Sequence, residues 1–162
     1  MGQTLSSTDF RVRAAHPSDM PRLAELINGY AERGLMLPRV PEQLARHFRE
    51  FVVVTDAEGK VLGCAALRVY TAQLAEMVAL AVDEAAQGLG VGRMLVERIE
   101  EEARALGVGT IFALTLQDSF FHRLGFRTVP KELFPLKVWA DCRTCPSRDA
   151  CMEIAVVREV DL

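Results

Sequence analysis

Three glycines at alternate positions, Gly88, Gly90 and Gly92, constrain the fold of this chain more than any other feature of its sequence. They follow an apolar run at residues 76–82, which is typical of a buried strand, and they precede a helical run that ends at Gly107. A glycine-rich turn that leads into a helix presents free backbone N–H groups, and such groups bind anions. The pattern therefore predicts a phosphate-binding loop. The alternative is a tight helix start without a ligand.

The spacing of these glycines argues against two common phosphate-binding loops. A dinucleotide fingerprint needs G-x-G-x-x-G directly after the first strand, but here the last spacing differs and the preceding strand is at least the fourth. A triphosphate loop needs G-x-x-x-x-G-K-[ST], and neither a lysine nor a hydroxyl residue follows Gly92. The loop keeps small residues at a helix start, and Arg93 can add a positive charge.

The rest of the sequence surrounds this loop with helix and strand patterns. We expect one helix capped by Ser18 and a second that begins at Pro41, with Leu44, Phe48 and Phe51 on one face. The runs typical of strands cover residues 10–15, 51–56, 61–70, 76–82, 110–116, 126–129 and 152–160. Because helices and strands do not alternate regularly, the order predicts a mixed α/β (α+β) domain and disfavours a doubly wound nucleotide-binding fold.

Length and composition fit one soluble domain. The chain has 162 residues, of which 50% are hydrophobic and 25% charged, and we expect a domain at residues 10–162 after a disordered tail at residues 1–9. The net charge of −3 argues against a nucleic-acid partner, and the apolar runs are too short for a membrane span. The first residues lack the features of a secretory signal, so we expect a cytoplasmic protein.

Two segments carry a resemblance to a known family. The stretch "LAVDEAAQGLGVGRMLVERIEEEARALG" at residues 80–107 resembles the acyl-CoA-binding segment of the GCN5-related N-acetyltransferase (GNAT) superfamily. Gln87, Gly90 and Gly92 fill its signature Q/R-x-x-G-x-G/A. The stretch "FFHRLGF" at residues 120–126 is similar to a second motif of that family, commonly F-Y-x-x-x-G-F. The resemblance covers residues 10–129 and implies a mostly antiparallel twisted sheet with a splayed pair of strands and flanking helices.

The same resemblance implies acetyl-CoA as the cosubstrate, with its pyrophosphate on the glycine loop. Leu80, Ala81 and Val82 would meet the pantetheine arm and the thioester through their main chain. The other cofactor contacts that it implies are Gln87, Gly88, Leu89, Gly90, Val91, Gly92, Arg93 and Phe121.

Acetyl transfer to an amine needs a base, a donor for the developing oxyanion and a leaving thiol. Glu76 resembles the glutamate that takes the amine proton through water in many family members, and the alternative is an exposed edge carboxylate. The family's frequent tyrosine acid falls at Phe121, which cannot donate a proton. Since a thiol with a pKa of about 8.5 leaves reasonably well as a thiolate, an acid is dispensable. Candidate substitutes for it are Tyr30, Tyr70, Ser119 and His122.

The phenylalanine at this position is itself informative, because the acetyltransferase domain of N-acetylglutamate synthase carries one there too. Residues 30–53 and 111–126 also resemble that branch. The resemblance implies L-glutamate as acceptor, in arginine biosynthesis, with Arg39 holding a substrate carboxylate in the forked geometry that arginine favours. The alternative is an ordinary loop arginine, and Lys137 and Arg68 are weaker candidates for the second carboxylate. Since the pattern starts by Phe10, we expect a short stand-alone form without a kinase-like domain.

Three cysteines lie close together in the segment 139–152. Cys142, Cys145 and Cys151 include a C-x-x-C spacing typical of metal sites, and Asp141, His122 or a partner chain could supply a fourth ligand. The alternatives are a structural zinc site, an iron–sulfur cluster, reduced loop thiols, or a cysteine pair oxidised after purification. A stable disulfide is disfavoured in a cytoplasmic chain. Cys64 is instead expected to be a small core residue.

Two other functions remain open from the sequence. The acceptor could be a different amine, such as a protein N-terminus, a polyamine or an antibiotic, or the domain could be a sensor that binds acyl-CoA or metal without turnover. Glu76 argues against the sensor, and a carboxylate-binding role of Arg39 would favour the amino acid. A homodimer also remains open.

Overall fold

The computed structural model describes residues 9–134 and 153–162 of the chain. Its elements in chain order are β1 (Arg11–Ala14), α1 (Met20–Glu32), α2 (Pro41–Ala45), β2 (Phe51–Thr55), β3 (Val61–Val69), β4 (Leu74–Val82), α3 (Val91–Leu106), β5 (Thr110–Thr115), α4 (Asp118–Arg123), β6 (Arg127–Val129) and β7 (Ile154–Glu159). Short 3-10 turns at Pro17–Asp19, Phe48–Glu50, Glu84–Ala86 and Lys131–Leu133 connect some of these elements.

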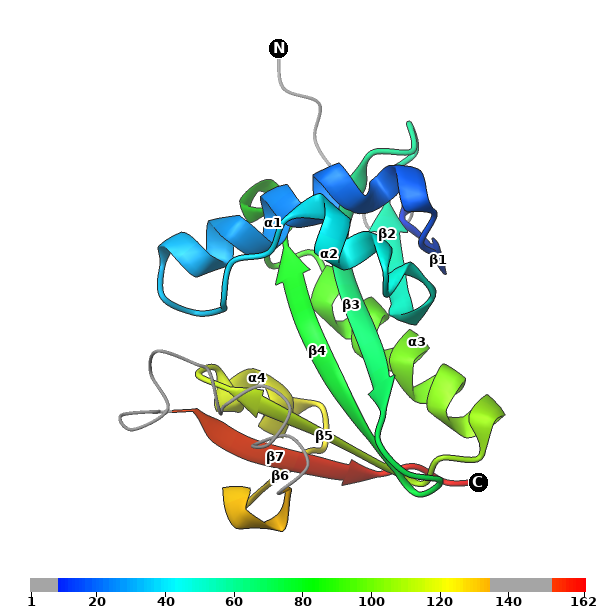
Figure 1. Ribbon diagram of the computed structural model, residues 1–162, viewed down its shortest axis with the longest axis vertical. Helices are drawn as coiled ribbons and strands as arrows, with labels where there is room; N and C mark the ends of the chain where they lie inside the picture. Colours follow the sequence, from blue (N-terminus) through cyan, green and yellow to red (C-terminus); the bar gives the residue numbers. More distant parts are fainter. Residues whose placement is uncertain (1–8, 135–152) are drawn as a thin grey trace.

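The strands form one sheet of seven in the order β1-β2-β3-β4-β5-β7-β6. Figure 1 shows how β3 and β4 lie relative to β5 and β7. Its neighbouring strands run antiparallel except β4 and β5, which are parallel. That parallel pair is short, because its register covers only Leu74–Glu76 opposite Thr110–Phe112. Beyond Glu76 the two strands diverge, and the sheet opens into a fork. The expected mixed fold, mostly antiparallel with a splayed pair of strands, is confirmed.

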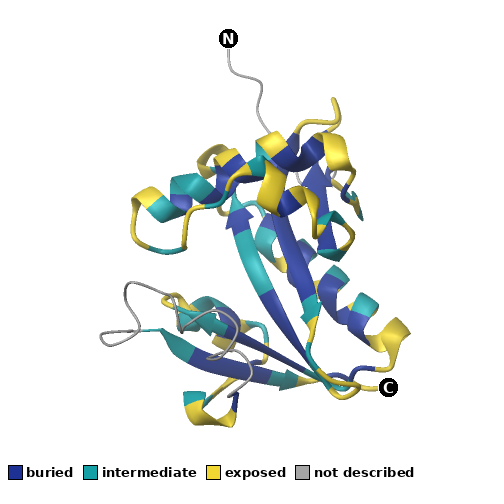
Figure 2. Ribbon diagram, in the orientation of Figure 1, coloured by how far each residue is buried: buried dark blue, intermediate teal, exposed yellow. Residues whose placement is uncertain are grey.

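Helices cover both faces of the β1–β4 half of the sheet. Strand residues alternate between two apolar clusters, so that Val52 and Val54 pack with α3 while Val53 packs with α1. This alternation follows from the two-residue period of a strand, and it explains why β2 is buried on both faces (Figure 2). The β5–β7 half has a smaller cluster of its own, around Phe112 and Phe134.

The start of α1 differs from the sequence-based expectation. A 3-10 turn precedes the helix, and Asp19 rather than Ser18 organises it. The Asp19 carboxylate accepts a hydrogen bond from the His16 backbone N–H at 2.7 Å. It also accepts two from the Arg13 guanidinium, at 2.8 and 3.0 Å, and thereby links β1 to α1.

Helical spacing predicts Phe51 on the apolar face of the second helix, and that prediction is wrong. α2 ends at Ala45, and Phe51 begins β2. The spacing of Leu44, Phe48 and Phe51 fits a helix, but Phe51 pairs with Ala66 in the sheet and its carbonyl accepts the Ala15 N–H at 3.0 Å. Sheet pairing therefore overrides the local pattern.

Two expected features lie outside the described residues, namely most of the N-terminal tail and the cysteine segment. Among the helices of the described ranges, none is long and apolar enough to cross a bilayer.

Candidate active site

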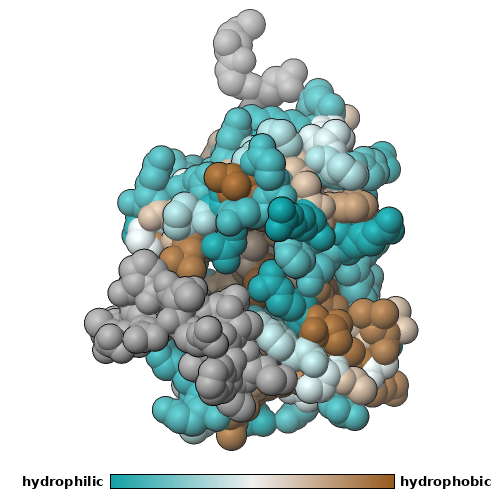
Figure 3. All heavy atoms as spheres, viewed as in Figure 1, coloured by the Kyte–Doolittle hydropathy of each residue, from teal (hydrophilic) through white to brown (hydrophobic). Residues whose placement is uncertain are grey.

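The fork between β4 and β5 opens into a cleft of about 900 Å³. Its walls come from the diverging halves of the two strands and from the segment after α1. The residues that line it include Tyr30, Gly34, Leu35, Met36, Leu37, Arg39, Arg46, His47, Arg68, Glu76, Leu80 and Phe121. The described surface on the face shown in Figure 3 is mostly hydrophilic, with its apolar residues in separate groups.

Glu76 lies at the apex of the fork. It is the last β4 residue paired with β5, and it stands opposite Arg68 on β3. Only 2% of it is exposed, so the alternative of an exposed edge carboxylate is wrong. The Tyr70 hydroxyl donates a hydrogen bond to Glu76 Oε1 at 2.9 Å. The structure thus holds a buried carboxylate against the wall of the cleft.

β4 carries a bulge just beyond this carboxylate. The register places Ala79 and Leu80 together opposite the single residue Ala65. Ala79 has a φ of 56°, in the left-handed region that non-glycine residues rarely adopt. Such a bulge re-aims the backbone of the strand that contains it.

The three β4 residues expected at the thioester differ in their surroundings. Leu80 lines the cleft. Ala81 is buried, and its strand partner is Cys64. The Val82 N–H already donates to the Tyr30 hydroxyl at 3.1 Å. Their role toward a thioester stays a prediction.

The glycine loop begins at Asp83, which ties it to other elements. The Asp83 N–H donates to the Leu62 carbonyl at 2.8 Å, and the carboxylate accepts the Ala85 N–H at 2.9 Å. Arg22 on α1 donates to the same carboxylate at 2.5 Å. The loop therefore starts from a fixed point at the end of β4.

Each glycine of the loop has its own structural reason. Gly88 and Gly90 have φ values of 79° and 88°, and Gly90 forms the N-terminal boundary of α3. Gly92 lies against Phe120, and a Cβ there would lie 3.0 Å from the ring, so the ring would have to shift to accommodate a side chain. The first hydrogen bond of α3 runs from the Met94 N–H to the Gly90 carbonyl at 3.0 Å. The preceding N–H groups of the helix are the ones that an anion at this end would meet.

The remaining expected cofactor residues spread over the same region. Gln87 and Arg93 are exposed and Leu89 half-buried on the loop and the first turn of α3, while Val91 is buried in the core. Phe121 on α4 is buried and lines the cleft. Its ring packs edge-on against Phe126 with centroids 5.2 Å apart.

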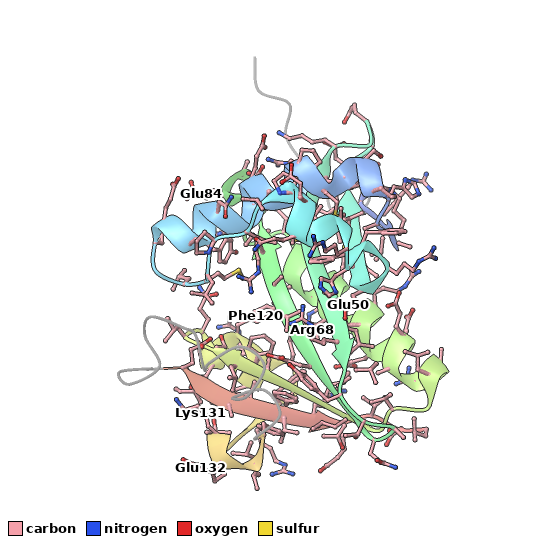
Figure 4. All side chains as sticks on the ribbon, in the orientation of Figure 1. Glu50, Arg68, Glu84, Phe120, Lys131 and Glu132 are labelled. Atoms are coloured by element: carbon pink, nitrogen blue, oxygen red, sulfur yellow. The ribbon has the colours of Figure 1, made fainter. Side chains whose placement is uncertain are left out.

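Positive side chains also line the cleft. Arg39, Arg46 and Arg68 all border it, together with His47. Arg68 Nε lies 3.7 Å from a carboxylate oxygen of Glu50, and Figure 4 shows these two residues. The sequence patterns do not single out Arg46 and His47, which directly follow the end of α2 in the run "LARH". Lys137, the other candidate for a substrate carboxylate, lies outside the described residues.

The four candidates for a general acid differ in their position relative to the cleft. Tyr30 lines the cleft, and Tyr70 contacts the catalytic candidate Glu76. Ser119 and His122 are exposed, and neither is among the described residues that line the cleft. The His122 ring is hydrogen-bonded to the Thr128 hydroxyl at 2.7 Å.

Cysteine chemistry plays no visible part in the described site. Burial raises the pKa of the Cys64 thiol to about 12, which keeps it protonated and confirms it as a core residue. Within residues 9–134 and 153–162, no three metal-ligating side chains gather. Cys142, Cys145, Cys151 and Asp141 lie outside these ranges, so a structural zinc there stays a prediction.

Comparisons with known proteins agree with this fold. Residues 20–126 match the Acetyltransferase (GNAT) family. The chain is 43% identical over 154 residues to an uncharacterised N-acetyltransferase of Chlorobaculum tepidum, a match that covers 95% of this chain and 99% of that protein. It is 38% identical over 120 residues to an amino-acid acetyltransferase of Mycobacterium tuberculosis, covering 73% of this chain and 68% of the relative.

A solved structure is also closely similar. N-acetylglutamate synthase from Neisseria gonorrhoeae, complexed with coenzyme A and N-acetyl-glutamate, matches with a TM-score of 0.85 and 32% identity. The match covers 94% of this chain but 35% of that protein, so this chain corresponds to about one third of the synthase. The fold, the sequence match and the relatives agree that this N-acetyltransferase belongs to the GNAT family.

Proposed function

We propose that the protein acetylates the amino group of a free amino acid, L-glutamate, with acetyl-CoA as donor and by direct attack of the amine on the thioester. The observation that carries the proposal is one cleft that the buried carboxylate of Glu76 shares with Arg39, Arg46 and Arg68. A carboxylate base and guanidinium groups are what an acceptor with one amine and two carboxylates needs. The similar synthase and amino-acid acetyltransferase support the same acceptor.

The glycine loop fits the phosphates of coenzyme A. Gly88 and Gly90 leave open space where a side chain would stand, and the loop leads directly into the N-terminus of α3. Free N–H groups and the positive end of the helix dipole favour a pyrophosphate there. Gln87 and Arg93 extend from the same loop and would add polar contacts. Bound acetyl-CoA supplies an activated acetyl group.

Residues of this chain would handle the proton and the charge. Glu76 accepts the amine proton, through water, from its place at the apex of the fork. The bulged residues Ala79 and Leu80 line the cleft, and we expect a backbone N–H of this part of β4 to stabilise negative charge on the acetyl oxygen. Among the described residues that line the cleft, Tyr30 is the tyrosine, so it is our candidate for the missing acid. A thiolate can also leave without an acid.

We further propose that the product enters arginine biosynthesis in the cytoplasm. The supporting observation is the resemblance to N-acetylglutamate synthase and to amino-acid acetyltransferases.

The first test is thiol release from acetyl-CoA by the purified protein across a panel of amino acids and simple amines. We expect rapid turnover with L-glutamate and slower turnover with L-glutamine, which lacks the side-chain carboxylate. Equal rates with polyamines or with neutral amino acids would reject the dicarboxylate acceptor. Tight coenzyme A binding without turnover on any acceptor would instead favour a peptide substrate or a sensor.

A further inference from the structure

The side chain of Asn28 holds the backbone of Arg39. The Asn28 amide nitrogen donates to the Arg39 carbonyl at 2.9 Å, and the Arg39 N–H donates to the Asn28 side-chain oxygen at 2.8 Å. One amide therefore satisfies both polar groups of a single residue, as a neighbouring strand would. The contact joins α1 to a position 11 residues later in the chain.

Asn28 is an unfavourable residue for its own helix. It lies within α1. A helix is less stable with asparagine than with alanine, because the asparagine side chain competes for backbone hydrogen bonds. Here the side chain is half-buried and bonds to a distant segment instead of its own helix. The contact it makes is thus a reason for its presence.

The segment between α1 and α2 lines the cleft along most of its length. Its first part is tied to the end of α1, because the Gly34 and Leu35 N–H groups donate to the Ala31 and Tyr30 carbonyls at 2.9 and 3.0 Å. Its last part leads into α2, where the Val40 N–H donates to the Gln43 side chain at 3.1 Å. Among described residues, the Asn28 amide is the side chain from outside the segment that bonds to residues 34–39.

We infer that Asn28 is a positioning residue for the acceptor: it fixes the backbone from which Arg39 reaches the cleft. The inference rests on the proposed function, in which Arg39 binds an acceptor carboxylate. Asn28 is not among the described residues that line the cleft, so it acts through Arg39 and not by touching the substrate. Without it, the guanidinium would sample more positions and bind the carboxylate less often.

The test is a double-mutant cycle with Asn28→Ala and Arg39→Ala, followed by steady-state kinetics. We expect Asn28→Ala to raise the glutamate KM about tenfold, the equivalent of losing two hydrogen bonds, while kcat and coenzyme A affinity change less than about twofold. In the Arg39→Ala background, Asn28→Ala should change the KM no further, because residues that act through one another are not additive. Glu32→Ala, on an exposed position of the same helix, is the matched control and should leave the KM unchanged.

Asn28→Asp separates the clamp from a general loss of folding. Aspartate has nearly the same shape and still accepts the Arg39 N–H, but its second oxygen would face the Arg39 carbonyl with no proton to donate. Its KM should therefore rise at least as much as that of Asn28→Ala, although the fold is kept. Amide hydrogen exchange gives a readout that does not depend on the acceptor. In Asn28→Ala the Arg39 N–H should exchange faster while the core amides of β2 and β3 keep their protection.

The outcomes separate a failure of the positioning role of Asn28 from a failure of the proposed function. An equal KM increase in both backgrounds, or unchanged exchange at Arg39, would overturn the positioning role of Asn28. Absence of glutamate turnover by the wild-type protein, or an unchanged KM in Arg39→Ala, would instead overturn the proposed function, and faster exchange at Arg39 would then still show the clamp.

Discussion

In the proposed function single residues would decide the chemistry of the cleft, and Glu76 is the first of them. It is the last β4 residue paired with β5, and it is also paired with Arg68 on β3, so both sides of its backbone are held while its side chain borders the cleft. The Tyr70 hydroxyl fixes one of its oxygens. A group held in this way can accept a proton repeatedly in the same geometry.

Replacing Glu76 with glutamine should lower kcat by about 100-fold or more, because general base catalysis contributes roughly that factor. Glutamine keeps the size of the side chain and can still accept the Tyr70 hydrogen bond, so coenzyme A affinity should stay within about threefold of wild type. Steady-state kinetics and calorimetric titration measure the two effects. A parallel loss of turnover and coenzyme A binding would argue that Glu76 supports the structure and is not the base.

The buried Cys64 thiol should make the folded protein less stable at alkaline pH. Because burial raises its pKa to about 12, the folded state keeps a proton that the unfolded chain releases at a pKa of about 8.5. The contribution of the protonated Cys64 thiol to the free energy of unfolding is fully present below pH ~8.5. It is lost as the pH rises from there toward the pKa of the folded state, with a slope of up to about 1.4 kcal/mol per pH unit. Urea unfolding of wild type and Cys64→Ala between pH 7 and 10 should show the wild-type free energy of unfolding falling more steeply. Parallel curves would contradict this.

The sequence reveals some of these residues and conceals others. Glu76, Arg39 and the glycines stand in motifs that match a family, so the amino-acid sequence alone is enough to find their positions. Asn28 and Glu50 do not belong to a recognisable motif. Asn28 contacts Arg39 and Glu50 contacts Arg68 only in the folded chain, so the sequence does not reveal these contacts. A lone asparagine in a helical pattern is a weak signal, and the same helix contains Pro21 and Gly29, which are still poorer helix formers.

At the level of elements, local patterns predicted well where packing agreed with them. The β2–β3 hairpin, α3 and β5 occur where periodicity placed them. Helical spacing failed at Phe51, where pairing with β3 decided the structure. The insertion of β7 between β5 and β6 could not be predicted, since strand order depends on contacts between residues far apart in sequence.

Two glycines in helical contexts should respond oppositely to alanine. Gly29 lies inside α1 with open space around its Cβ position, so Gly29→Ala should stabilise the protein by about 0.5–1 kcal/mol. Gly90 has a φ of 88°, so Gly90→Ala should destabilise it by about 1–2 kcal/mol and weaken coenzyme A binding. Urea unfolding measures the free energy of unfolding of both variants, and each variant serves as the control for the other. Equal effects of the same sign would show that the turn at Gly90 is not required.

At the level of the whole molecule, the two halves of the sheet are joined through a short seam. The β4–β5 register has three residue pairs, supplemented by the Thr110 N–H, which donates to the Gln73 carbonyl at 3.1 Å. A ligand that bridges the fork would add contacts between the two halves, beyond this seam and the apolar cluster that both halves share. Such a ligand stabilises the folded state by mass action.

Coenzyme A should raise the melting temperature accordingly. At 100 times its Kd the ligand contributes about 2.7 kcal/mol, which for a domain of this size corresponds to roughly 5–10 °C. Thermal unfolding with and without coenzyme A measures the shift, and adenosine serves as the control because it lacks the pyrophosphate and the pantetheine arm. A shift of the same size with adenosine would place the binding energy away from the glycine loop.

The fork also has a consequence for how the chain must fold. Where strands diverge, β4 presents backbone donors and acceptors as an edge strand does, and its "MVALAV" run has none of the charged residues that usually protect edges. Short, uncharged segments of high β-propensity readily pair with copies of themselves. Self-association during refolding is therefore expected to start at residues 77–82, before α1 and the following segment have covered them. A lysine placed in this run should suppress aggregation but also disturb the wall of the cleft.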